Sequence, residues 1–229
     1  MNREFPPLYA ILSADLLSSP SPEYAAEFAV ELAVTLANAG VGIIQYRNKH
    51  ATARSLLEVS TQISRALAKT SARFVVNDRA DIARLSGANG VHVGQDDLPV
   101  EDARAIAQQV KSQSERTVAS EKFWVGISTH TLEQVRQAAT TTADYIAIGP
   151  IFATTTKQNH EPIVGTDFIR QARQLTNKPL VAIGGITVAT ADEVFRAGAD
   201  SIAVARDLIR AKNPAGRAAE YLAIAKKFP

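Results

Sequence analysis

Short apolar runs alternate with longer amphipathic segments along almost the whole chain. Each run is continuous, as expected of a strand with both faces buried, and each longer segment has the periodicity of a surface helix. The predicted strands are Leu8–Ser13, Gly42–Arg47, Phe74–Asn77, Gly90–Gly94, Phe123–Ser128, Tyr145–Gly149, Leu180–Ile183 and Ser201–Ala205. The predicted helices are Pro22–Asn38, Thr52–Lys69, Ala80–Leu85, Val100–Val110, Leu132–Ala139, Asp167–Leu175, Ala189–Ala197 and Pro214–Lys227.

This order of elements predicts a single α/β domain over residues 1–229. Helices between successive strands act as crossovers, so the strands are expected to pair in parallel. About eight strand–helix units favour a closed (β/α)8 TIM barrel over an open doubly wound sheet. Residues 1–7 are predicted to form an N-terminal tail, and the polar stretch 111–122 to form a surface loop.

Five short polar or glycine-rich clusters follow predicted strands. A barrel builds its active site at the carboxyl ends of its strands, so these clusters are where chemistry is expected. Pairs of carboxylates suit a hard cation such as Mg²⁺, while Arg, Lys and a Gly-Gly turn suit phosphate groups. The clusters are Gln45–Lys49, Asn77–Asp78, Gln95–Asp97, Thr154–Lys157 and Ala182–Gly185.

The first cluster directs one amide and two cations to the same side of a strand. Side chains two residues apart point the same way, so Gln45, Arg47 and Lys49 share a side. Arg offers a planar fork and Lys a point charge to the oxygens of a diphosphate. The alternative is a solvated strand end with both cations in water.

Asp78 and Asp97 offer carboxylates at the ends of two different strands. Mg²⁺ commonly takes one or two protein carboxylates and completes its shell with water and phosphate. Taken singly, Asp78 is more typical of a helix N-cap, and Asp97 of a turn residue. Two strand ends that supply carboxylates to one axis favour the metal site.

The later clusters suggest phosphate contacts and a closing loop. Ser128 either donates to a phosphate oxygen or begins the next turn. The small polar loop at Thr154–Lys157 suits a segment that closes over substrate, or a plain surface loop. Gly184 and Gly185 let the backbone approach an anion, with an ordinary tight turn as the alternative. His92 lies inside an apolar strand, which favours a hydrogen-bonded interior histidine over a ligand.

The amino-acid composition limits which binding partners and which cellular compartment are expected. With 229 residues, 46% of them hydrophobic, the chain can fill a large core, and 25 basic against 23 acidic residues leave a net charge of only +2. Neither nucleic acid nor an anionic membrane is suggested. The absence of Cys excludes disulfides and thiolate chemistry. No secretory signal or membrane span is apparent, so a cytoplasmic protein is expected, and a homo-oligomer is compatible with the sequence.

The ordered motifs resemble those of the thiamine phosphate synthase family over nearly the whole barrel, from about Leu8 to Leu208. Each motif is weak by itself, but their joint order and spacing are specific. They are Gln45-x-Arg47-x-Lys49, Val76-Asn77-Asp78, His92-Val93-Gly94-Gln95-Asp96-Asp97, Gly126-Ile127-Ser128-Thr129-His130, Gly149-Pro150-Ile151-Phe152-Ala153-Thr154-Thr155-Thr156-Lys157 and Ile183-Gly184-Gly185-Ile186.

The resemblance implies a Mg²⁺-dependent transferase that joins hydroxymethylpyrimidine diphosphate to thiazole phosphate and releases diphosphate. It implies that Asp78 and Asp97 bind the metal and that Ser128 contacts the diphosphate. Arg47, Lys49 and Lys157 would stabilise the departing diphosphate. The residues implied to hold the pyrimidine diphosphate are Gln45, Arg47, Lys49, Asn77 and Lys157, and those for the thiazole phosphate are Thr154, Thr156, Gly185 and the residues after the eighth strand.

One position departs from the family pattern. Where a small Ser is common after the last strand, this chain has Arg206. Its guanidinium either points inward to the thiazole phosphate or turns outward to pair with a carboxylate such as Asp207. Two other functions fit a similar barrel: a thiazole tautomerase, and a non-catalytic protein that binds thiamine precursors. The tautomerase reaction needs neither Mg²⁺ nor a diphosphate clamp, so Asp78, Asp97 and Lys157 argue against it.

Overall fold

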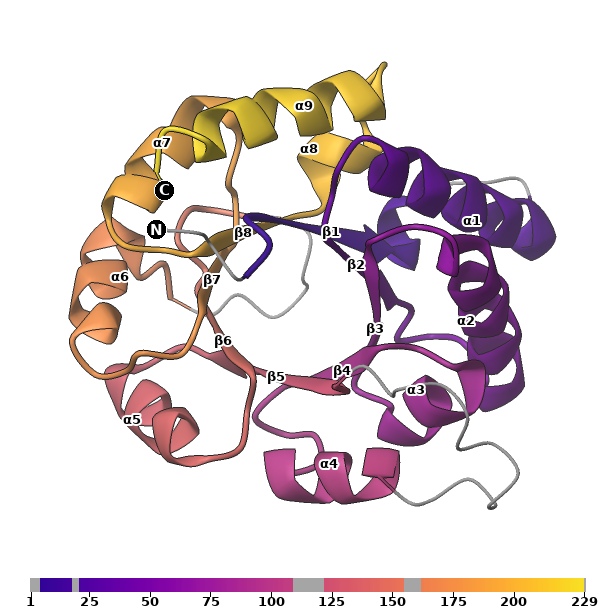
Figure 1. Ribbon diagram of the computed structural model, residues 1–229, viewed down its shortest axis with the longest axis horizontal. Coiled ribbons are helices and arrows are strands. Elements are labelled where there is room, and N and C mark those ends of the chain that lie inside the picture. The colour runs from indigo at the N-terminus through magenta and orange to yellow at the C-terminus, as the bar shows by residue number, and fades with distance from the viewer. Residues whose placement is uncertain (1–4, 18–20, 109–121, 155–161, 229) are drawn as a thin grey trace.

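Eight parallel strands close into a barrel, and helices form a ring around it (Figure 1). The computed structural model describes residues 5–17, 21–108, 122–154 and 162–228. The strands are β1 (Leu8–Ser13), β2 (Ile43–Arg47), β3 (Arg73–Asn77), β4 (Gly90–Val93), β5 (Trp124–Thr129), β6 (Tyr145–Ile148), β7 (Leu180–Ile183) and β8 (Ser201–Val204). The helices are η1 (Ala14–Leu16), α1 (Pro22–Asn38), α2 (Ala53–Leu67), α3 (Ala80–Ser86), α4 (Val100–Gln108), α5 (Leu132–Thr140), α6 (Gly165–Arg173), α7 (Val188–Arg196), α8 (Arg206–Ile209) and α9 (Pro214–Ala225).

The pairing of β1 with β8 closes the barrel. Leu8 lies opposite Ile202 and Tyr9 opposite Ala203 in this parallel register. Every residue of β1, β4, β6 and β8 is buried, because helices cover the outside of each strand and side chains fill the inside. The predicted TIM barrel with parallel strands is therefore confirmed.

Two hydrophobic cores share the strands between them. The larger core lies between the barrel and its helices, and the smaller one fills the barrel. The smaller core consists of Phe5, Tyr9, Ile11, Ile43, Val75, Tyr145, Ala147, Val181 and Ala203. Phe5 comes from the predicted N-terminal tail, yet it is 6% exposed and stacks on Trp124 with ring centroids 5.1 Å apart.

Local signals in the sequence explain where several helices begin and end. The Thr131 hydroxyl accepts from the backbone N–H of Gln134, whose side chain bonds back to Thr131, and this capping box starts α5. Gly40 follows α1 with φ +93°, as a left-handed residue just beyond a helix end. Most of the predicted loop 111–122 lies outside the described residues.

The short helix α8 was not predicted from the sequence. The strand predicted as Ser201–Ala205 ends at Val204, and Ala205 is instead the N-cap residue of α8. Asp207 in this helix accepts from the Tyr221 hydroxyl at 2.6 Å and pairs with Arg217 at 3.1 Å. These contacts with α9 hold a helix that is too short to show an apolar period. Within the described residues, no helix is long and apolar enough to cross a membrane.

Candidate active site

A cavity of about 610 Å³ lies at the carboxyl ends of the strands. Its wall continues the inward-facing side of the strands, where every second residue points to the barrel axis. Apolar side chains from the barrel interior form part of it, and polar groups from the strand ends form the rest. The apolar members include Ile11, Ala147, Ile183 and Ala203, and the polar members include Ser13, Arg47, Ser128, His130, Thr154, Thr187, Arg206 and Asp207.

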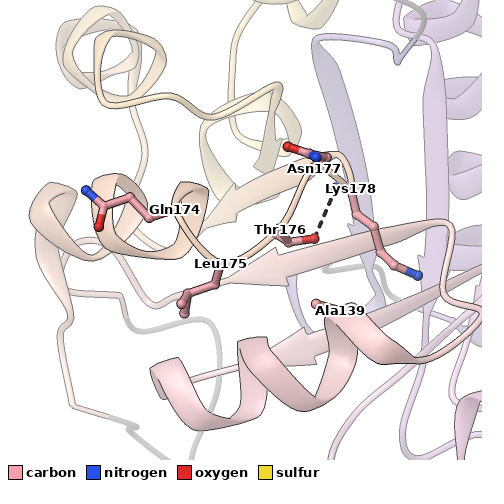
Figure 2. A pocket seen from close by; sticks show the side chains of 6 residues that line it. All are labelled: Ala139, Gln174, Leu175, Thr176, Asn177 and Lys178. Atoms are coloured by element: carbon pink, nitrogen blue, oxygen red, sulfur yellow. Dashed lines mark hydrogen bonds between the residues drawn. The ribbon is translucent and has the colours of Figure 1, made fainter.

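A second, more open hollow of about 550 Å³ lies beside the segment that leads into β7 (Figure 2). Residues 174–178 and Ala139 line it, at the amino-terminal end of the barrel. The charged side chain in this lining, Lys178, donates its amine to the Ala143 carbonyl oxygen at 2.8 Å. Burial lowers the pKa of this amine. Because the strand carboxyl ends are elsewhere, this hollow is not the candidate active site.

Arg47 reaches the cavity from the end of β2 and is held there by the end of β1. Its Nη1 donates to Asp15 Oδ2 at 3.0 Å and to Ser13 Oγ at 3.3 Å, and its side chain is 12% exposed. His50 Nε2 lies 3.6 Å from the other Asp15 oxygen. Asp15 was missed by the sequence reasoning, although only Ala14 separates it from the first predicted strand and the same strand-end rule could have found it.

Gln45 lies two residues before Arg47 on the inward side of β2. The side chain is 2% exposed, and its Nε2 has no hydrogen-bond partner within the described part of the chain. A buried donor without an acceptor costs about 1–3 kcal/mol. A substrate that supplies an acceptor would remove this cost, as the prediction for Gln45 requires.

The side chains of Lys49, Asp78 and Asp97 meet just after the ends of β2, β3 and β4. Lys49 Nζ lies 3.2 Å from Asp78 Oδ2, and the Asp78 carboxyl is in hydrogen-bond contact with the carboxyl of Asp97. Burial raises the pKa of Asp78, the adjacent Asp97 raises it further, and Lys49 opposes the shift. The two carboxyls therefore repel one another when both are charged, and a cation between them would relieve that repulsion.

The alternative of Asp78 as a helix cap is wrong. Arg79, not Asp78, is the N-cap residue of α3, and no side-chain cap bond is formed. Asp78 has φ +62°, an unusual value for a residue with a side chain, and its N–H donates to the His92 carbonyl oxygen at 2.8 Å. Asp97 does stabilise the turn after β4, because its Oδ2 accepts a hydrogen bond from the Gly94 N–H at 2.7 Å.

Two carboxylates are what the described residues offer to a metal. No group of three or more His, Cys, Asp or Glu that could hold an ion is found among them. Mg²⁺ is commonly bound by one or two carboxylates and takes its other oxygens from water and phosphate, so the carboxyls of Asp78 and Asp97 are groups that could hold it. Asn77, at the end of β3 beside Asp78, is partly exposed in the same region.

Ser128 lies on the cavity wall at the end of β5. Its Oγ is 2.8 Å from His92 Nε2, and its carbonyl oxygen accepts from Gln95 Nε2. His92 is 8% exposed, and its Nδ1 lies 3.1 Å from the Tyr145 hydroxyl. The prediction of a hydrogen-bonded interior histidine is confirmed. Ser128 thus lines the cavity while its hydroxyl is hydrogen-bonded to His92.

The Gly184–Gly185 turn after β7 brings the backbone to the wall of the cavity. The two glycines have φ +102° and +65°, a region that other residues rarely adopt. A Cβ on Gly184 would lie 2.6 Å from Pro150 Cβ, and one on Gly185 would lie 2.8 Å from Phe152 Cβ. Only glycine therefore fits both positions, and the turn can expose its N–H groups to an anion.

Arg206 begins α8 and lines the same part of the cavity. The outward alternative, a pair with Asp207, is not formed, because Asp207 is bound to Arg217 and Tyr221. Among the described residues, no ion pair or hydrogen bond is found for the Arg206 guanidinium, which remains available to a ligand. Thr154 also lines the cavity, whereas Thr156 and Lys157 lie outside the described residues.

Comparison with known proteins decides the family. The sequence profile described as Thiamine monophosphate synthase matches residues 16–208. The chain belongs to this family. A Thiamine-phosphate synthase of Koribacter versatilis (strain Ellin345) is 47% identical over 223 residues, which cover 96% of each chain. Another of Chloroflexus aurantiacus is 40% identical over 185 residues, which cover 81% of this chain and 80% of the relative.

A solved structure of a thiamine phosphate pyrophosphorylase from Pyrococcus furiosus has the same architecture. It superposes with a TM-score of 0.81 at 28% identity and covers 99% of this chain and 98% of its own. Membership of the thiamine monophosphate synthase family confirms the resemblance seen in the ordered motifs and the expectation of a transferase.

Proposed function

We propose that the protein is a thiamine-phosphate synthase that joins hydroxymethylpyrimidine diphosphate to thiazole phosphate and releases diphosphate. The observation that carries this proposal is the presence of two separate anion-binding regions around one barrel mouth. One contains Arg47, Lys49 and the carboxylate pair. The other contains the Gly184–Gly185 turn and Arg206. A reaction between a diphosphate ester and a phosphate ester requires two such regions.

The carboxylate pair fits Mg²⁺ as a cofactor. Asp78 and Asp97 would hold the ion, since burial and mutual repulsion already strain the pair in its charged form. When bound, Mg²⁺ neutralises diphosphate charge and so makes the diphosphate a better leaving group. Lys49, which now neutralises Asp78 at 3.2 Å, would then be released toward the substrate.

The reaction divides into bond cleavage and bond formation. The bond between the pyrimidine methylene carbon and the diphosphate oxygen breaks, and its electron pair leaves with the diphosphate. Arg47, Lys49 and Lys157 stabilise the charge that grows on the departing oxygens, while Ser128 donates a hydrogen bond to them. The lone pair of the thiazole nitrogen then forms the new bond to the methylene carbon. Positioning and electrostatics suffice, so no protein nucleophile takes part.

The apolar part of the cavity wall protects the cation formed between these steps. Ile11, Ile183 and Ala203 line the cavity and would provide a surface on which the two rings can pack. Exclusion of water there favours attack by the thiazole over hydrolysis of the pyrimidine cation. Gln45, with its unpartnered amide, supplies a donor to the pyrimidine substrate.

The decisive experiment supplies the purified protein with both substrates and Mg²⁺. Thiamine phosphate and diphosphate, separated by chromatography, are expected in equal amounts. A parallel reaction contains only the thiazole carboxylate phosphate. Isomerisation of that compound without coupling would instead indicate the tautomerase, and binding of both substrates without any product would indicate a non-catalytic barrel.

Lys157→Ala is expected to lower kcat at least tenfold and leave the KM for the pyrimidine diphosphate within a few-fold. The reason is that the charge on the departing diphosphate grows during cleavage, so the lysine stabilises the transition state more than the bound substrate. Steady-state kinetics with Lys226→Ala, an exposed lysine at the end of α9, provides the matched control. A higher KM with normal kcat would make Lys157 an anchor for the substrate instead.

Arg206→Ser is expected to raise the KM for thiazole phosphate about tenfold, which corresponds to ~1.4 kcal/mol, without affecting the KM for the pyrimidine diphosphate. Arg206 lines the cavity, and no ion pair is found for its guanidinium among the described residues, so a phosphate is a suitable partner. Arg65→Ser, in the last turn of α2, removes an arginine far from the cavity as a control. If both KM values stay at wild type, backbone amides alone hold the phosphate.

A further inference from the structure

A chain of buried hydrogen bonds crosses the barrel interior and ends at the cavity. The hydroxyls of Tyr9 and Tyr145 are 3.0 Å apart, and the Tyr145 hydroxyl is 3.1 Å from His92 Nδ1. On the other side of the imidazole ring, His92 Nε2 is 2.8 Å from Ser128 Oγ. The four residues come from β1, β6, β4 and β5, so only barrel closure brings them together.

The surroundings of this chain are apolar. Tyr9 is 2% exposed and Tyr145 is fully buried, with the rings of Phe5 and Trp124 packed around Tyr145. Gly126, opposite Tyr145 in the register, provides space for the ring, since a Cβ there would overlap it. Burial raises the pKa of both tyrosines well above the ordinary value, so both hydroxyls keep their protons.

The donors and acceptors in this series of hydrogen bonds have a preferred order, because the Tyr9 hydroxyl at one end is buried. Within the described residues, the one hydrogen-bond partner found for the Tyr9 hydroxyl is Tyr145. If Tyr9 accepted that bond, its own proton would be a buried donor without a partner, and such donors are rarer in proteins than acceptors with unused lone pairs. Tyr9 therefore donates to Tyr145, and the Tyr145 proton is left for His92 Nδ1.

The same logic passes through the imidazole ring to the cavity. A neutral histidine has one donor and one acceptor nitrogen, so a bond accepted at Nδ1 places the ring proton on Nε2. His92 Nε2 then donates to Ser128 Oγ. A serine hydroxyl has a single proton, and in this direction the bond to His92 does not use that proton. If the bond ran the other way, Ser128 would donate its proton to His92 Nε2 and could offer only lone pairs to an anion.

We propose that His92 and Tyr145 are positioning residues that orient the Ser128 hydroxyl as a hydrogen-bond donor toward the substrate diphosphate. This positioning role depends on the proposed function in one respect, because that function identifies the bound anion as the substrate diphosphate. No proton is transferred along the chain, since each group keeps its own hydrogen. The network acts by fixing one tautomer of His92 and one orientation of Ser128 before substrate arrives, which lowers the cost of binding and stabilising the leaving group.

The tautomer of His92 tests the direction without any substrate. Nitrogen-15 NMR of the ligand-free protein, with the His92 signals assigned through their loss in His92→Gln, is expected to show a protonated Nε2 and an unprotonated Nδ1. In Tyr145→Phe, the Nδ1 signal should move toward that of a nitrogen without a hydrogen bond. A protonated Nδ1 in the wild-type protein would overturn the proposal.

Substitutions at His92 test whether the network acts through Ser128. His92→Leu is expected to weaken binding of inorganic diphosphate in the presence of Mg²⁺ about tenfold, measured by calorimetry, and to lower kcat/KM for the pyrimidine diphosphate to a similar extent. His92→Gln, whose side-chain N–H can replace Nε2–H, should recover most of the loss. The KM for thiazole phosphate should not change in either variant.

A double-mutant cycle separates positioning from general damage to the core. Ser128→Ala should itself cost about tenfold, and adding His92→Leu to it should cost little more, because the hydroxyl that His92 orients is already absent. Equal losses from His92→Leu with and without Ser128 would overturn the proposal. A wild-type protein that binds diphosphate with the predicted coupling but forms no thiamine phosphate would contradict the proposed function while leaving the network intact.

Discussion

Replacing Asp97 with Asn is expected to reduce Mg²⁺-dependent turnover at least tenfold, or ~1.4 kcal/mol of transition-state stabilisation, while the protein still folds. The Asn side-chain oxygen can still accept from the Gly94 N–H, which Asp97 now binds at 2.7 Å, so the turn is preserved. What is lost is one of the two negative charges beside Lys49. Turnover measured over a range of Mg²⁺ concentrations should therefore show weaker metal dependence as well as a lower maximum.

Thermal unfolding provides the control for Asp97→Asn. Without Mg²⁺ the variant should melt at or above the temperature of the wild type, because the repulsion that raises the pKa of Asp78 is reduced. Addition of Mg²⁺ should stabilise the wild type and have less effect on the variant. Asp96→Asn, which changes the exposed neighbouring carboxylate, should behave as wild type. If the Mg²⁺ titration is unchanged in Asp97→Asn, Asp97 stabilises the turn only and does not bind the metal.

Gly185→Ala is expected to raise the KM for thiazole phosphate at least tenfold and to destabilise the protein by on the order of 2 kcal/mol or more. Two costs add at this position. The backbone has φ +65°, which disfavours a side chain, and the new Cβ would lie 2.8 Å from Phe152 Cβ and overlap the Ala153 carbonyl oxygen. Relief of that overlap moves the turn that lines the cavity. Steady-state kinetics and chemical denaturation measure the two effects.

Gly87→Ala is the matched control for the backbone cost alone. Gly87 ends α3 with φ +77°, and the nearest atom to an added Cβ is Ser64 Oγ at an ordinary 3.4 Å. This variant should lose about 1–2 kcal/mol of stability and keep both KM values. If Gly185→Ala loses no more stability than Gly87→Ala and binds thiazole phosphate normally, the turn after β7 does not hold the phosphate.

The order of elements was predictable because each is specified by neighbouring residues. Continuous apolar runs and helical periodicity predicted eight strands and the helices between them, with boundaries that differ from the structure by a few residues. Parallel strands must then place their carboxyl ends at one face, so Arg47, Asp78, Asp97, Ser128 and Gly185 could be assigned to one site before any distance was known. The exceptions were η1 and α8, which are three and four residues long and so too short to show a helical period.

Contacts between distant segments were decided only by the tertiary structure. The sequence predicted Arg47 as a free cation or a diphosphate ligand, but the pairing of β2 with β1 brings it within 3.0 Å of Asp15, which follows β1. Likewise, the docking of α9 engages Asp207 with Arg217, while no ion pair is found for Arg206 among the described residues. Such pairings depend on register and helix packing over long separations, which periodicity does not encode. The sequence by itself determined which residues stand at the strand ends, and tertiary packing decided which of them neutralise one another and which stay available for ligands.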